Sequence, residues 1–177
     1  MAKQISTTYG NALFELALEE GKLDQLLEEV TEVRDIFKSN EELGKLLNHP
    51  KIPKEEKITC IENIYKSKVS DELLGIMVVM IKKDRQKGIV DVFDYYERRY
   101  MEYKNIGTAY ITSAVDLRDE QKKAIEGKLL DTTRYEKLIA RYEVDKAIIG
   151  GLVIRIEDRV VDSSIKTQIE LLSKSLN

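Results

Sequence analysis

This 177-residue chain has few of the side chains from which most enzyme and metal sites are built. It holds one cysteine (Cys60), one histidine (His49), two prolines and no tryptophan. A lone cysteine excludes an intrachain disulfide, and one cysteine with one histidine is not the cluster that a zinc site requires. We expect Cys60 to be a small buried hydrophobe and His49, next to Pro50 at a helix end, to be a turn residue.

The sequence also lacks the motifs of membrane-spanning, secreted and nucleotide-binding proteins. The chain has no apolar run of about 18 residues, so we predict no membrane-spanning helix. Residues 1–4 lead into no apolar segment of the kind found in signal peptides. No Gly-x-x-x-x-Gly-Lys-Ser/Thr loop is present, Gly150-Gly151 lacks the third glycine of a dinucleotide site, and Ser163-Ser164 has no nearby general base. We therefore find few candidates for an enzyme active site, and we expect no cofactor and no metal.

The charges that are present are numerous and nearly balanced. Charged residues make up 34% of the chain and the formal net charge is −3, so the sequence lacks the basic footprint of a nucleic-acid-binding protein. Residues 1–48 contain ten acidic and five basic residues, whereas residues 105–177 contain twelve of each. The acidic N-terminal part suits a basic or neutral partner helix, or is simply a solvated surface.

From residue 5 to residue 103 the apolar residues recur at helical spacing, which predicts six helices. Gly21 is placed to end the first helix, Asn40 to cap the third, and His49-Pro50 to stop it. Pro53 suits the first turn of the fourth helix, and Ser70 suits the cap of the fifth. The fifth helix is apolar around most of its circumference, so we expect it at the centre of a bundle.

The pattern changes after residue 105. Residues 108–115 and 137–144 are rich in strand formers, and a helix is predicted between them over residues 119–130. That helix should turn four apolar residues inward: Ala124, Ile125, Leu129 and Leu130. We predict an α+β chain of two domains, with a six-helix bundle over residues 1–105 and a small α/β domain over residues 106–177. The second domain should hold a three- or four-stranded sheet and two helices.

Residues 142–165 form the most informative stretch. They read as a strand, a Gly-Gly break, a β-branched strand, a polar turn over residues 157–159, a short return strand and the start of a helix near Asp162. A Cβ at Gly150 or Gly151 would obstruct a bulge or a close backbone approach. None of these residues is an obvious nucleophile, metal ligand or phosphate-binding group, so we interpret the segment as architectural.

Within that stretch the residues Asp145, Gly150, Gly151, Asp162 and Ser164 occur in an order that resembles a structural signature. It is the C-terminal signature of the F-type ATP synthase delta subunit family, whose mitochondrial counterpart is the oligomycin-sensitivity-conferring protein. The rest of the chain is similar in the same order, at residues 9–14 (Tyr-Gly-Asn-Ala-Leu-Phe), residues 46–50 (Leu-Leu-Asn-His-Pro), Lys57 and Arg85. The departures are Gly10, Lys83 and Ser163, where alanine, asparagine and glycine are usual.

The resemblance implies a non-catalytic stator subunit of a bacterial F-type ATP synthase. Such a subunit would link the N-termini of alpha subunits in the catalytic head to the b subunits of the peripheral stalk during proton-driven ATP synthesis. Residues 1–105 would bind the head, and residues 106–177 would bind the C-terminal ends of the b subunits. The implied location is peripheral, on the cytoplasmic face of the bacterial plasma membrane, with no direct membrane insertion and no nucleic-acid partner.

In the resembled family, the first and fifth helices form a groove for the N-terminal helix of an alpha subunit. Carried over residue by residue, this groove involves Tyr9, Leu13, Leu74, Met77, Val78, Val79 and Arg85. By their pattern alone, the apolar members could also be the core of a small bundle. Arg85 could bind the last carbonyls of the fifth helix or an acidic partner.

An enzyme is an open alternative that a screen for metal content and nucleotide hydrolysis would test. Two further functions fit the composition. One is a generic helical adaptor with different partners. The other is an RNA-binding module, whose sheet would face bases while tyrosines of the sixth helix stack on them. Those tyrosines are Tyr95, Tyr96, Tyr100 and Tyr103. The neutral charge of residues 105–177 argues against RNA, because single-stranded binding needs a basic groove.

Overall fold

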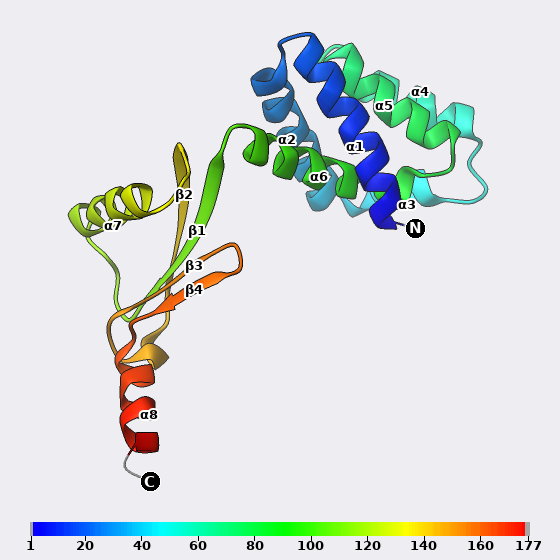
Figure 1. Cartoon of the computed structure of the whole chain (residues 1–177). Coiled ribbons are helices and arrows are strands. Elements are labelled where there is room, and N and C mark those ends of the chain that lie inside the picture. Colours follow the sequence, from blue (N-terminus) through cyan, green and yellow to red (C-terminus); the bar gives the residue numbers. More distant parts are fainter. Residues whose placement is uncertain (1, 176–177) are drawn as a thin grey trace. The chain divides into compact units, whose positions relative to one another are not determined.

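Eight α-helices and one four-stranded sheet are found in the described part of the chain, residues 2–175 of the computed structural model (Figure 1). Side chains are described from residue 4 to residue 174. The chain divides after Tyr100 into two compact units. The predicted α+β class is confirmed.

Helices alone make up the first unit up to its boundary. In chain order they are α1 (Ala2–Glu19), α2 (Leu23–Ser39), α3 (Glu41–Asn48), α4 (Lys54–Tyr65), α5 (Asp71–Lys82) and α6 (Ile89–Tyr103), with a 3-10 turn η1 (Gln86–Gly88) before the last. As its apolar composition predicts, α5 is central: it packs against α1, α2 and α4. Five of its side chains are buried: Leu73, Leu74, Met77, Met80 and Ile81.

Two helix ends follow from local sequence. Gly21 takes φ 69° after α1, where its N–H donates to the Leu18 carbonyl and the Lys22 N–H donates to the Ala17 carbonyl. This is a Schellman end, and glycine has no Cβ to oppose the left-handed backbone. The Asn40 side chain accepts from the first N–H groups of α3, as expected of a cap. At α4 the prediction is off by one residue, since Pro53 precedes the helix instead of occupying its first turn.

The start of α5 differs from the local prediction. Ser70 occupies the cap position but its side chain makes no capping bond. Instead its N–H and Oγ both donate to Glu29 Oε2 on α2, at 2.8 and 2.6 Å. A carboxylate from another helix therefore stands before α5, where negative charge is favourable.

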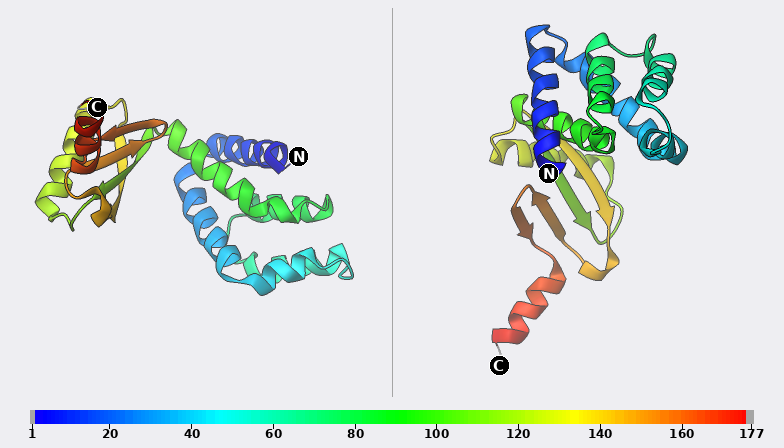
Figure 2. Two further views of the ribbon diagram at one scale, coloured as in Figure 1. Left: turned by 90° about the horizontal axis from the view of Figure 1, so that it is seen from below. Right: turned by 90° about the vertical axis from the view of Figure 1, so that its right-hand side faces the viewer.

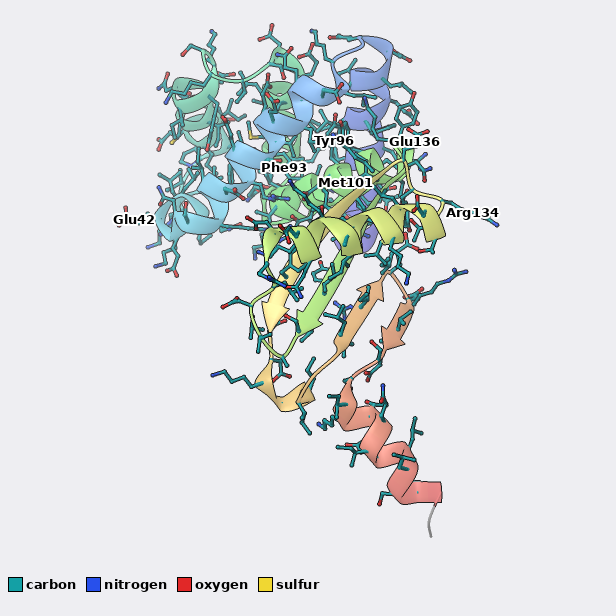
Figure 3. All side chains as sticks on the ribbon, turned by 90° about the vertical axis from the view of Figure 1, so that its left-hand side faces the viewer. Glu42, Phe93, Tyr96, Met101, Arg134 and Glu136 are labelled. Atoms are coloured by element: carbon teal, nitrogen blue, oxygen red, sulfur yellow. The ribbon has the colours of Figure 1, made fainter. Side chains whose placement is uncertain are left out.

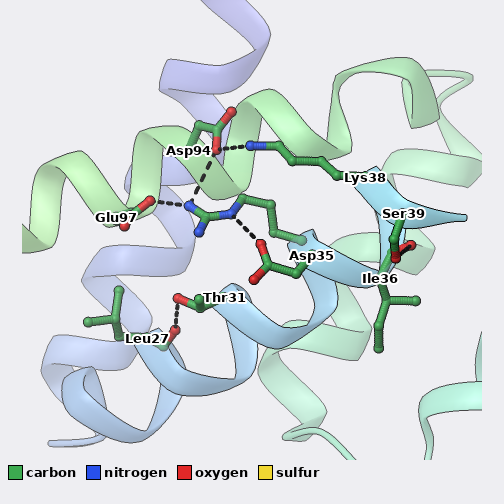
Figure 4. Close-up of polar contacts among 9 residues, drawn as sticks. Leu27, Thr31, Asp35, Ile36, Lys38, Ser39, Asp94 and Glu97 are labelled. Carbon is green, nitrogen blue, oxygen red and sulfur yellow. Dashed lines mark hydrogen bonds and ion pairs between the residues drawn. The ribbon is translucent and has the colours of Figure 1, made fainter. Parts of the chain in front are cut away.

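A charged network joins α2 to α6 (Figure 4). The Arg34 guanidinium donates to Glu97 and lies 3.4 Å from Asp94 Oδ1, which also accepts from Lys38 Nζ at 3.1 Å. The side chain of Arg34 is only 13% exposed, so its pairing with carboxylates is required to offset the loss of hydration. The same two helices also meet through the rings of Phe37 on α2 and the buried Phe93 on α6, whose centres lie 6.3 Å apart.

The second unit is built on a mixed sheet in the order β2-β1-β3-β4. Its elements are β1 (Ile106–Ser113), α7 (Asp119–Thr132), β2 (Lys137–Val144), a 3-10 turn η2 (Lys146–Ile148), β3 (Leu152–Ile156), β4 (Arg159–Asp162) and α8 (Ile165–Ser175). The β1–β2 pair is parallel, with α7 as the crossover, and the other two pairs are antiparallel. The prediction over residues 108–115 is shifted, because β1 begins two residues earlier and ends at Ser113.

The helix α7 covers one face of the sheet only in part (Figures 2 and 3). It packs on β2, where the Tyr142 hydroxyl donates to Glu126 Oε1 at 2.9 Å. No residue of α7 is fully buried, and Ala124 and Leu130 are exposed, so the prediction that they face inward is wrong. The core of this unit is small: its buried apolar side chains among the described residues are Ala109, Ile111 and Ile148.

Candidate partner-binding surfaces

The side chains predicted to line a groove between α1 and α5 fall into two groups. Leu13, Leu74 and Met77 are 1%, 9% and 0% exposed, so they belong to the core where the two helices pack. Val79 is 43% exposed, and Tyr9 and Val78 are half-buried. Of the predicted groove residues, Tyr9, Val78 and Val79 therefore retain exposed surface, as does Arg85, which lies beside Tyr9.

The position of Arg85 is set by the way α5 ends. Asp84 takes a left-handed backbone at φ 55°, and its N–H donates to the Ile81 carbonyl at 3.0 Å. The Arg85 N–H donates to the Met80 carbonyl at 2.8 Å, which completes a Schellman end. Lys54 of α4 donates its Nζ to the Lys82 carbonyl at 3.2 Å and pairs with Asp84. Of the two roles open to Arg85, binding the last carbonyls is thus performed by Lys54.

The Arg85 side chain turns toward α1. Its guanidinium carbon lies 5.8 Å from the centre of the Tyr9 ring, within the range of a cation–π interaction. Among the described residues its guanidinium has no ion pair. Its donors are therefore available to an acidic group on a partner.

The polar residues of the C-terminal signature hold two local turns by hydrogen bonds. Asp145 Oδ1 accepts from the Ala147 N–H at 2.8 Å and so opens η2. Asp162 accepts from the Ser164 N–H at 2.8 Å and from the Thr167 hydroxyl at 2.7 Å. The hydrogen bonds from Ser164, and then that from Thr167, hold the pKa of the Asp162 carboxyl below its usual range. Ser164 is buried and its Oγ accepts from the Thr167 N–H, which caps the start of α8.

The two glycines of the signature lie in close packing, Gly150 against a side chain and Gly151 against the backbone. A Cβ at Gly150 would lie 2.6 Å from Cδ1 of Ile165, the first residue of α8. Gly151 has φ 79°, and a Cβ there would lie 2.3 Å from the carbonyl oxygen of Ser163. The two glycines therefore allow the residues just before β3 to pack against the residues just before and at the start of α8.

A second surface, for which sequence reasoning named no residues, lies between α7 and the uncovered half of the sheet. It is a groove of about 930 Å³, called here the α7/β3 groove. Its apolar lining comes from Ile125 and Leu129 of α7 and from Leu152, Ile154, Ile156 and Val161 of the sheet. The strand alternation of residues 152–156 is the signal that could have suggested it, but the coverage left open by α7 is a tertiary feature.

No cluster of three or more His, Cys, Asp or Glu side chains that could bind a metal occurs in residues 2–175. His49 Nδ1 accepts from the Lys51 N–H at 3.2 Å, which is a turn contact. Within the same part of the chain, no helix has the length and apolar character needed to cross a membrane.

Comparison with known proteins gives a consistent result. Residues 5–176 match the family described as ATP synthase delta (OSCP) subunit. The chain is 52% identical over 176 residues to ATP synthase subunit delta of Lachnoclostridium phytofermentans, covering 99% of this chain and 97% of that protein. It is 32% identical over 170 residues to the Clostridium perfringens subunit delta, covering 96% and 94%. A chain of the Toxoplasma gondii mitochondrial ATP synthase hexamer has the same fold, with a TM-score of 0.73 at 15% identity over 97% of this chain and 96% of that one.

Proposed function

Because the chain belongs to the ATP synthase delta (OSCP) subunit family, we propose that it is the joint between the catalytic head and the peripheral stalk of a bacterial synthase. It is a non-catalytic stator subunit of an F-type ATP synthase. The observation that carries this assignment is the 52% identity to a bacterial delta subunit across 99% of the chain.

The proposed division of labour follows the two halves of the chain. Residues 1–105 act as one six-helix bundle that binds the N-terminal helices of alpha subunits through α1 and α5. Residues 106–177 bind the C-terminal ends of the b subunits. Support for the first joint comes from the surface of Tyr9, Val78, Val79 and Arg85. Support for the second comes from the small core of that unit and from the apolar residues that it exposes.

A stator joint needs strong binding because it resists torque through every turn of the rotor. An amphipathic helix on a prepared surface can bury about 1,200–2,000 Å² in total. Nanomolar binding corresponds to about −12 kcal/mol. The buried residues Leu13, Leu74 and Met77 fix the spacing of α1 and α5, so the exposed residues are preorganised and little ordering energy is lost on binding.

We place the subunit peripherally on the cytoplasmic face of the bacterial plasma membrane, as part of a synthase driven by protons. In this arrangement the chain does not enter the bilayer.

A binding titration tests the head joint. The full chain is titrated with a peptide of the alpha N-terminal segment from the same organism, as wild type and as Val79→Asp. The matched control is Ile36→Asp on α2, because Ile36 is also 43% exposed. We expect Val79→Asp to weaken binding by tenfold or more and Ile36→Asp to leave it within about twofold, since only the first places a charge in the apolar contact. Equal effects of the two variants, or no binding by the wild type, would refute this joint.

A further inference from the structure

The α7/β3 groove continues the core of the second unit. Ile154 is paired with the buried Ile111 on one side and with Val161 on the other, so all three lie on one face of the sheet. That face is covered by α7 over β2 and is open over β3 and β4. The groove is therefore an extension of the core that no helix or strand of the second unit covers, within its described residues 101–175.

The side chains that line the groove are incompletely buried. Ile125, Leu129, Leu152, Ile154 and Ile156 are only half-buried, and Val161 is 62% exposed. Thr133 also lines the groove, and its Oγ1 is buried without a hydrogen-bond partner among the described residues. An occupant would bury the apolar side chains and offer that hydroxyl a partner.

The charged residues around the groove indicate the charge of the molecule that would bind there. Three cationic residues line it: Lys128 of α7, Arg134 in the turn after α7 (Figure 3), and Arg159 of β4. None of the three has an ion pair among the described residues. The one acidic residue in the lining, Glu157, already accepts from the Tyr135 hydroxyl at 2.5 Å. The rim is therefore basic and favours an anionic partner.

Size and shape point to a short helix. The five residues of β3 span about 17 Å at a strand rise of about 3.3 Å. That length corresponds to about 11 residues, or three turns, of an α-helix. A helix lying across the open face would resemble α7 in its packing.

The chain's own α8 does not suit this groove. Its described charges are Lys166, Glu170 and Lys174, which sum to a positive helix facing a basic rim. It begins beyond β4, contacts η2, and extends away from the sheet in Figure 1 and in the right-hand view of Figure 2. The apolar side chains of α8 are themselves exposed, so they form a second apolar surface that is separate from the groove. They are Ile165, Ile169, Leu171 and Leu172.

We propose that the α7/β3 groove binds a short amphipathic helix whose apolar stripe is flanked by glutamate or aspartate. The inference rests on the proposed function, in that the helix would come from a subunit of the peripheral stalk. Apolar residues of the partner helix fill the space over Ile154 and Val161, and its carboxylates meet Lys128 and Arg159.

A peptide titration on the full chain tests this proposal. The probes are two 18-residue helical peptides, about one groove length and a half, with the same leucine stripe flanked by glutamates in one and by lysines in the other. The variants are Arg159→Glu and Lys128→Glu. The matched control is Arg141→Glu, which makes the same charge change on the opposite face of the sheet, paired with Tyr110.

We expect the glutamate peptide to bind at least about tenfold more tightly than the lysine peptide at low salt. Arg159→Glu and Lys128→Glu should each weaken it about tenfold, and Arg141→Glu should change it less than about twofold. Equal binding of the two peptides, no binding of either, or equal effects of all three variants would overturn the proposal. A tenfold gain in affinity on Ile169→Asp would overturn it as well, because it would show α8 competing for the groove.

The same variants separate this proposal from the stator function. If the purified stalk b subunit binds wild type and Arg159→Glu equally well, the groove is not its site, although the stator function stands. If the b subunit does not bind the wild-type chain at all, the stator function is contradicted, while the peptide titrations still decide what the groove binds.

Discussion

The guanidinium carbon of Arg85 lies 5.8 Å from the centre of the Tyr9 ring, so a side chain three residues beyond the end of α5 contacts α1. The backbone end of α5 does not depend on this side chain, because Lys54 and the Schellman hydrogen bonds already satisfy its carbonyls. Arg85 is thus placed on a surface that we assign to a partner.

Replacing Arg85 with glutamine separates binding from stability. An exposed cation–π interaction is worth about 0.5–1 kcal/mol, so the free energy of unfolding should fall by no more than about 1 kcal/mol. The affinity for the alpha N-terminal peptide should fall about threefold to tenfold as a charged donor is lost. Calorimetric titration and urea denaturation measure the two effects. Arg98→Gln on the exposed side of α6 is the control, and a loss of about 2 kcal/mol of stability with unchanged affinity would show that Arg85 is structural.

Gly10 should respond to alanine in the sense opposite to an ordinary helix glycine. A Cβ at Gly10 would lie 2.4 Å from Cδ1 of Tyr95, whose hydroxyl donates to Asn11 Oδ1 at 2.9 Å. The gain in helix propensity, up to about 1 kcal/mol, is outweighed by overpacking of about 1–3 kcal/mol, so Gly10→Ala should destabilise the chain. In a Tyr95→Leu background the same change should stabilise it. Chemical denaturation of the four proteins measures the reversal, and Gly10→Ala stabilising in both backgrounds would exclude the close packing.

Gly151→Ala should weaken the second unit strongly. The substitution combines a left-handed φ of 79° with a Cβ only 2.3 Å from the Ser163 carbonyl oxygen, which predicts a loss of at least about 2 kcal/mol. Gly127→Ala within α7 is the matched control, because nothing lies within 4 Å of its Cβ position and alanine should stabilise by up to about 1 kcal/mol. Hydrogen exchange of the β3 and β4 amides reports on this unit separately. Unchanged exchange in Gly151→Ala would contradict the packing.

The carboxyl group of Glu72 makes the free energy of unfolding depend on pH below pH 4.5. A hydrogen bond shared with Glu20, and then one from Lys22 Nζ, lowers the pKa of the Glu72 carboxyl from 4.5 to about 2. Because the pKa is lower in the folded state, this stabilisation is present above pH 4.5 and is lost as the pH falls toward about 2. Glu72→Gln should therefore lower the urea midpoint at pH 6 and flatten its fall over that window. Parallel curves for the two proteins between pH 5 and pH 2 would refute the linkage.

Residues close in sequence account for the features that could be predicted. β2 occupies residues 137–144 as its alternation indicates, and α1 ends where Gly21 supplies a left-handed position. Asn40 caps α3 because its Oδ1 accepts from N–H groups only two and three residues further along the chain. In each case the interaction that determines the structure joins residues close in sequence, so a local pattern is enough to predict it.

Features that depend on distant residues could not be predicted. Ser70 was expected to cap α5, yet Glu29, 41 positions away, accepts from it. Leu130 was expected to face inward, yet it is 37% exposed because α7 covers only the β2 side of the sheet. The α7/β3 groove arises from that partial coverage, and no local pattern contains it.

ATP synthesis driven by a proton gradient, in membrane vesicles from cells lacking this chain, tests the bridging role most directly. We expect the catalytic head to wash off such vesicles and synthesis to be lost, with both restored when purified wild-type chain is added back. Vesicles that keep the head bound and synthesise ATP at the undiminished rate without the chain would contradict the role.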